Sequence, residues 1–186
     1  MEKLITTKDI LKALYTCASK EDTRQHISGF FILPDRRVYS TDGCRLVVIR
    51  HDSFEKLPAG AYTFLGKPAY NKGLGEIIIE KANHTGPDID PLLKDLDKQV
   101  ICRHVFVSDK ADYALNISCL LAKIFNGYKA MLNYALLDFF PAGEGFAVTT
   151  ADLIVPNKGI KFTLNTSRWI EFSAVVMPIR WNEVKD

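Results

Sequence analysis

The sequence predicts an α+β protein in which a β-α-β-β-β unit occurs twice. Two observations carry this prediction. A helix pattern, with apolar residues recurring at three- and four-residue intervals, follows a short strand near the start of the chain and again after residue 112. Short strands separated by turn residues follow each helix pattern. The repeat is one of pattern, not of identity, and it indicates two half-modules with antiparallel sheets and two amphipathic helices.

The first half-module covers residues 1–52. Residues 3–6 are expected to form a strand, and Thr6 to cap the following helix, with Asp9 at the capping-box position. That helix is expected to run to about Lys20. Its predicted apolar face consists of Ile10, Leu11, Leu14, Cys17 and Ala18. Strands are expected at residues 27–33, 38–41 and 44–51, and Asp42-Gly43 is a strong signal for a tight turn between the last two.

The second half-module covers residues 113–180, with a tail at 181–186. A short strand at 113–115 precedes Asn116, a good helix cap, and Gly127 suits the C-terminal end. The helix between them has its apolar residues at Ile117, Leu120, Leu121, Ile124 and Phe125. Strands are expected at residues 130–138, 146–150, 160–164 and 169–177.

The middle segment, residues 53–112, is less regular. Strand-like runs occur at 62–65, 76–81 and 100–107, with glycines and a proline between them. The acidic stretch PDIDPLLKDLDKQ fits a solvated loop or one helical turn better than a metal site, because no EF-hand arrangement of oxygen ligands is present. We expect an irregular insertion or linker here, within a single domain spanning residues 1–186.

The amino-acid composition limits the classes of function that the sequence supports. The formal net charge is +2, from 24 basic and 22 acidic residues, which is too small to argue for nucleic acid or membrane but leaves room for a local basic face. The four cysteines form no C-x-x-C pair, so we expect reduced thiols, a cytoplasmic protein and no metal or other cofactor. No signal peptide or membrane span is expected.

The sequence contains few of the features that are typical of an enzyme active site. The four histidines are scattered, and neither a phosphate-binding loop nor a G-x-S-x-G or H-E-x-x-H motif occurs. Asp42 with His51, or Cys102 with His104, could act as a pair, but proximity in sequence is not geometry. We therefore expect a protein that is not an enzyme, with a small enzyme as a remote alternative.

Three stretches resemble the bacterial DNA polymerase III beta subunit, the sliding DNA clamp. LITTKDILKALYTCASKEDTRQHISGFFI is similar to a clamp's opening strand, helix and following strand. STDGCRLVVIR resembles the family's T-D-G-H-R-L corner, with Cys44 where histidine is usual. SAVVMPIR resembles the closing V-M-P-M-R segment. The resemblance implies a DNA-clamp-like fold, and a short one, because clamp subunits have three domains.

The resemblance also implies a surface for duplex DNA. Clamps line their channel with basic helices that meet phosphates without reading bases, and such contacts are diffuse and sensitive to salt. The matching cations are Lys8, Lys12, Lys20, Arg24, Arg45 and Lys123. An ordinary solvated face is the simpler interpretation of any single lysine, and for the set as a whole both interpretations stay open.

A second implied site is a peptide-docking groove. In clamps the V-M-P-M-R segment helps to form an apolar cleft for short linear motifs of polymerases and other partners. The matching residues are Met177, Pro178, Ile179 and Arg180. A buried strand that ends at Pro178 is the alternative.

The function expected from these features is a clamp-like tether or processivity factor in DNA replication or repair, or an accessory of a phage or mobile element. Its partners would be duplex DNA, bound independently of sequence, polymerase or clamp-binding peptides, and further copies of itself. A ring would need roughly six copies. The alternative is a clamp-derived interaction module that does not encircle DNA.

Overall fold

The computed structural model describes residues 1–105, 122, 126, 132, 134–137, 145–150, 159–164 and 171–177. The chain divides into two compact units. The first comprises Met1–Pro87 with Arg168–Phe172, and the second comprises Asp88–Ser167 with Ser173–Asp186.

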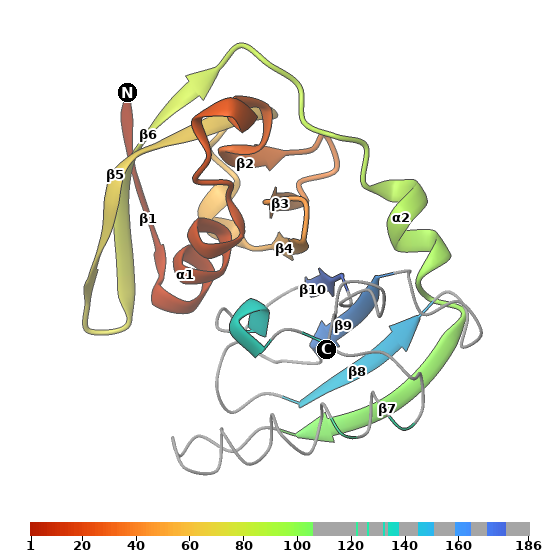
Figure 1. Cartoon of the computed structure of the whole chain (residues 1–186). Coiled ribbons are helices and arrows are strands. Elements are labelled where there is room, and N and C mark those ends of the chain that lie inside the picture. The colour runs from red at the N-terminus through yellow and green to blue at the C-terminus, as the bar shows by residue number, and fades with distance from the viewer. Residues whose placement is uncertain are drawn as a thin grey trace, which may run out of the picture. The chain divides into compact units, whose positions relative to one another are not determined.

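The first unit contains an antiparallel sheet. Its strands are β1 (Glu2–Thr7), β2 (Gly29–Ile32), β3 (Val38–Thr41), β4 (Arg45–Arg50), β5 (Gly60–Asn71) and β6 (Leu74–Ala82). They lie in the order β1-β6-β5-β2-β3-β4, and β5 and β6 form a long hairpin (Figure 1). The predicted hairpin of β3 and β4 is confirmed, with Thr41 opposite Leu46.

One helix, α1 (Lys8–Cys17), lies over this sheet (Figure 1). The predicted apolar face is confirmed, because all five of its residues are buried. Gly75 of β6 lets the helix approach closely, since a side chain there would meet Leu11 at 2.8 Å. Short 3-10 turns lie at Asp22–Ile27 and Asp52–Phe54.

Both ends of α1 differ from the prediction. Thr6 is not the cap, because its side chain is buried and its hydroxyl accepts a hydrogen bond from the Ser53 hydroxyl at 2.8 Å. The next residue, Thr7, caps the helix, and its hydroxyl accepts a hydrogen bond from the backbone N–H of Ile10 at 3.4 Å. The helix ends at Cys17 because Ala18 adopts an extended backbone. Lys20 therefore lies beyond the helix, on the connection to the next turn.

The core of the first unit is aromatic. Phe30 of β2 is fully buried, and its ring stacks on Tyr62 at 5.2 Å between centroids. Phe54 and Phe64 approach the same ring at 5.9 and 5.2 Å. These contacts join β2 and β5 to the turn at Asp52–Phe54, so Phe30 is the centre of the packing that supports α1.

The middle of the chain is more regular than the sequence suggested. Residues 60–82 form β5 and β6, and these strands lie between β1 and β2 in the sheet. The acidic stretch contains a single short helix, α2 (Asp90–Asp95), in agreement with the helical-turn interpretation. The expected irregular insertion thus contributes strands to the first unit and the start of the second.

In the second unit the described strands are β7 (Gln99–Val105), β8 (Gly145–Thr150), β9 (Ile160–Leu164) and β10 (Glu171–Val176), in the order β10-β9-β8-β7. Residues 171 and 172 of β10 are assigned to the first unit. The predicted strand at 130–138 is wrong over Tyr134–Leu137, which form a 3-10 turn, because a short apolar run does not distinguish the two structures. Most of the predicted second helix lies outside the described residues; Ala122 and Asn126, which are described, are helical and exposed.

The predicted α+β class is confirmed by the helix over the antiparallel sheet. No helix among the described residues is long and apolar enough to cross a membrane.

Candidate nucleic-acid interface

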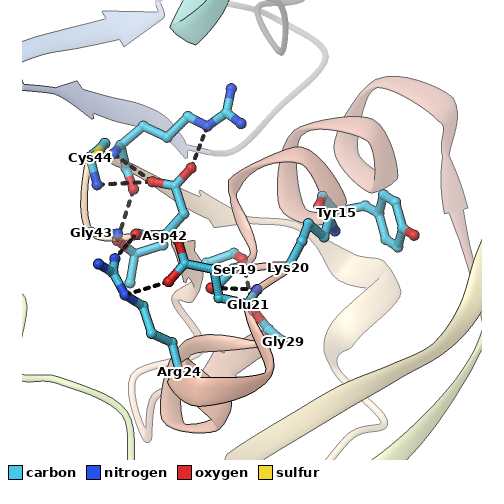
Figure 2. Close-up of polar contacts among 12 residues, drawn as sticks. Tyr15, Ser19, Lys20, Glu21, Arg24, Gly29, Asp42, Gly43 and Cys44 are labelled. Atoms are coloured by element: carbon cyan, nitrogen blue, oxygen red, sulfur yellow. Dashed lines mark hydrogen bonds and ion pairs between the residues drawn. The ribbon is translucent and has the colours of Figure 1, made fainter.

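The turn between β3 and β4 is held by side-chain hydrogen bonds to the backbone. The Asp42 carboxylate accepts the backbone N–H groups of Cys44 and Arg45, each at 2.9 Å (Figure 2). The Thr41 hydroxyl accepts the N–H of Gly43 at 3.1 Å. Gly43 has φ of 90°, a left-handed conformation that favours glycine. The T-D-G sequence therefore fixes the turn by local chemistry.

Arg45 folds back onto this turn. Its Nε lies 2.8 Å from the second carboxylate oxygen of Asp42, and the two side chains are only 14% and 20% exposed. The guanidinium thus braces the turn, and Asp42 offsets part of its charge. Sequence reasoning placed the cation correctly on the corner but missed its acidic partner.

Arg24 lies beside the same turn. Its Nε is 2.9 Å from a Glu21 carboxylate oxygen, and its Nη1 donates to the backbone carbonyl of Asp42 at 3.1 Å (Figure 2). The Arg24 side chain is 46% exposed, so it remains open to solvent. The spacing of three residues between Glu21 and Arg24 was the sequence signal that could have revealed this pair.

Lys20 lies on the connection between α1 and the 3-10 turn at Asp22–Ile27. Its ammonium donates to the backbone carbonyl of Tyr15 at 2.6 Å and lies 3.4 Å from the centroid of the Tyr15 ring. Burial lowers the pKa of Lys20 below its ordinary value, and the positive charge of Arg45 lowers it further. Glu21, the next residue, pairs with Arg24, which itself contacts the backbone carbonyl of Asp42, so this connection lies beside the β3–β4 turn.

The remaining cations of α1 lie on its outward face. Lys8 is exposed and its ammonium is 6.0 Å from the centroid of the Tyr70 ring, whereas Lys12 is half-buried. The structure thus gathers Lys20, Arg24 and Arg45 around one turn, next to the helix that carries Lys8 and Lys12. We call these five residues the basic face. Lys123 lies outside the described residues.

The Asp42 contacts give a test of the turn. We expect Asp42→Ala to lower the free energy of unfolding by about 2 kcal/mol, because two backbone N–H groups and Arg45 lose a bonded acceptor. Asp42→Asn should lower the free energy of unfolding by less, because its amide oxygen can still accept hydrogen bonds from the two backbone N–H groups. Urea denaturation of both variants measures the difference. An equal loss in the two would contradict a role for the backbone hydrogen bonds.

The predicted peptide-docking residues are described only in part. Met177 follows β10 and is 36% exposed, whereas Pro178, Ile179 and Arg180 lie outside the described residues. A side chain at Gly159 would meet the Met177 sulfur at 3.2 Å and the Leu96 side chain at 3.6 Å. Gly159 and Leu96 therefore contribute to the surroundings of Met177, and nothing in the sequence pattern pointed to either.

Within the described residues, no group of three or more His, Cys, Asp and Glu side chains is placed to hold a metal ion. Cys17, which is buried, and Cys44, which is exposed on the turn, are not joined in a disulfide bond.

The helix packed on an antiparallel sheet defines an α+β protein. No protein-family model and no curated protein sequence matches the chain. The solved structures that it resembles are DNA polymerase III beta sliding clamps, so the predicted resemblance is confirmed at the level of the fold.

Three of these structures show how far the likeness extends. The clamp from Borrelia burgdorferi is 8% identical, with a TM-score of 0.52 over 97% of this chain and 65% of the clamp. The Bartonella birtlesii clamp is 14% identical, with a TM-score of 0.50 over 96% of this chain and 66% of that one. The C. crescentus clamp is 12% identical, with the same TM-score and coverage. The chain thus spans about two thirds of a clamp subunit's length.

Proposed function

We propose that this protein is a non-catalytic, clamp-like DNA-associated protein that contacts duplex phosphates through its basic face. The observation that carries the proposal is the gathering of Lys20, Arg24 and Arg45 at one turn beside the outward face of α1. Arginine and lysine side chains that meet phosphates give affinity without sequence specificity, which suits a sliding or tethering role in replication or repair. Lys123 is part of the same proposal.

The acidic partners limit the strength of the contact. Asp42 and Glu21 each pair with an arginine, so the basic face carries less net charge than its cations alone suggest. We therefore expect modest affinity that falls steeply as salt rises. Encircling DNA would require several copies of the chain, and light scattering in the presence and absence of duplex measures that assembly.

The direct experiment is a titration of a fluorescent duplex at increasing salt, followed by anisotropy. We expect the logarithm of the binding constant to fall linearly with the logarithm of the salt concentration, with a slope of roughly −0.9 for each phosphate contacted. Two duplexes of unrelated sequence should give the same line. A binding constant that does not change with salt concentration, or the absence of binding at low salt, would contradict the proposal.

A second candidate function is that of a protein-interaction module, favoured by the exposure of Met177 beside Leu96 and Gly159. A flexible thioether at an apolar surface suits a short linear peptide, and the proposed groove would include Pro178, Ile179 and Arg180. We expect Met177→Ala to weaken binding of a clamp-binding peptide by about ten-fold, a typical cost for a central apolar contact. Unchanged peptide affinity in the variant would contradict this candidate.

A further inference from the structure

A pocket of about 310 Å³ opens beside the end of α1, against strand β5. It belongs entirely to the first unit and is separate from the turn at residues 41–45. Its volume lies at the lower end of the range of small-molecule sites, roughly 300–1,000 Å³, so it suits a ligand no larger than a single nucleotide.

One wall of the pocket is aromatic. Tyr15 and Phe64 line it, with ring centroids 5.4 Å apart in an edge-to-face arrangement. Phe64 is held from behind by Phe30, at 5.2 Å between centroids. The Lys20 ammonium covers one face of the Tyr15 ring, so the open aromatic surface for an unstacked base is provided chiefly by Phe64.

The polar part of the pocket suits a phosphate. Lys20 lines it, and an ammonium has three donors, of which one is used on the Tyr15 carbonyl. Ser19, Ser28 and Thr63 also line the pocket, each with a hydroxyl group.

Glu21 is the acidic residue of the lining, and its carboxylate is directed to Arg24 at 2.9 Å. Because Arg24 does not line the pocket, it balances the Glu21 charge from outside. A ligand in the pocket therefore meets the positive charge of Lys20 and a Glu21 carboxylate whose charge Arg24 offsets in part.

We propose that this pocket binds one unpaired nucleotide, with its phosphate on Lys20 and its base against Tyr15 and Phe64. This proposal adds a binding site to the DNA-associated protein proposed above. It rests on that proposed function only in that DNA would supply the nucleotide. Duplex phosphates would meet the basic face, whereas a strand end or a single-stranded segment could also place a base in the pocket. The protein would then favour DNA that carries unpaired nucleotides over a fully paired duplex.

Protonation of Lys20 is coupled to this binding. Burial and the Arg45 charge lower the pKa of Lys20, whereas Cys17 and the negative charge of Asp42 act in the opposite direction. A bound phosphate stabilises the protonated amine, so affinity is full below the lowered pKa and is lost as pH rises through it. This loss should occur at a lower pH than for an exposed lysine, whose pKa is about 10.4.

The experiment is a calorimetric titration of the whole chain with thymidine 5′-monophosphate. Thymidine and inorganic phosphate are titrated separately as base-only and phosphate-only probes. We expect the monophosphate to bind more tightly than either probe, and Lys20→Gln to weaken it by about ten-fold, because a charge-assisted contact is lost. The control is Lys56→Gln, an exposed lysine outside the pocket and the basic face, which should leave the affinity unchanged. Circular dichroism verifies that both variants fold.

A duplex titration of the same samples separates this proposal from the proposed function. Binding of duplex without binding of the monophosphate overturns the pocket and leaves the DNA association standing. The reverse result supports the pocket and removes the DNA association, and failure of both ligands removes both. An unchanged affinity in Lys20→Gln, or equal affinity for inorganic phosphate and the nucleotide, overturns the pocket as well.

Discussion

Replacing Lys8, Lys12, Lys20 and Arg24 together with alanine should lower the affinity for duplex DNA on the order of a hundred-fold at low salt, because up to four phosphate contacts and their released counterions are lost. The slope of the salt dependence should shrink by up to roughly 3.6, since each contact contributes about 0.9. Anisotropy with the same fluorescent duplex measures both quantities.

A matched variant controls for net charge. Lys3, Lys56, Lys81 and Lys94 are exposed lysines outside the basic face, and their joint replacement by alanine removes the same charge. This control should lose only the small, long-range part of the attraction. Equal losses in the two variants would mean that DNA responds to total charge alone, and the basic face would have no special role.

The largest loss of stability is expected from Phe30→Ala. Phe30 is fully buried and three aromatic rings surround it, at centroid distances of 5.2, 5.2 and 5.9 Å. Removing this ring leaves a cavity that rigid strands cannot close, so the free energy of unfolding should fall by about 4 kcal/mol. Urea denaturation followed by far-ultraviolet circular dichroism provides the measurement.

The control for this variant is Leu74→Ala. Leu74 lies at the start of β6 and is 54% exposed, so its truncation should change the free energy of unfolding by less than about 0.5 kcal/mol. If the two substitutions proved equally costly, the aromatic cluster around Phe30 would not be the main packing centre of the first unit.

Local chemistry made parts of the fold predictable. The buried face of α1 follows from apolar residues at helical spacing, and the β3–β4 hairpin follows from Asp42-Gly43. The helix start was wrong by one residue because Thr6 and Thr7 are equally good caps in isolation. A contact distant in sequence decides between them, because the buried Thr6 hydroxyl accepts a hydrogen bond from Ser53 and Thr7 is left to cap the helix.

Sequence patterns also did not reveal the side-chain contacts that assemble the candidate site. Arg45 was recognisable as a cation on a corner, but its contact with Asp42 depends on how the turn folds. The pocket beside Tyr15 and Lys20 includes Thr63 and Phe64 from β5, which fall in the strand expected at residues 62–65, but no pattern indicated that this strand lies beside the end of α1. A site assembled from segments this far apart has no signature in composition or spacing.

The most direct test of the central claim is a chemical-shift map of the backbone amides during titration with a short duplex at low salt. We predict that the largest shifts fall in residues 8–24 and 41–45, and that they reverse when salt is added. Shifts concentrated on the opposite face of the sheet, at Ile5 and Ile78, or no shifts at low salt, would contradict the account.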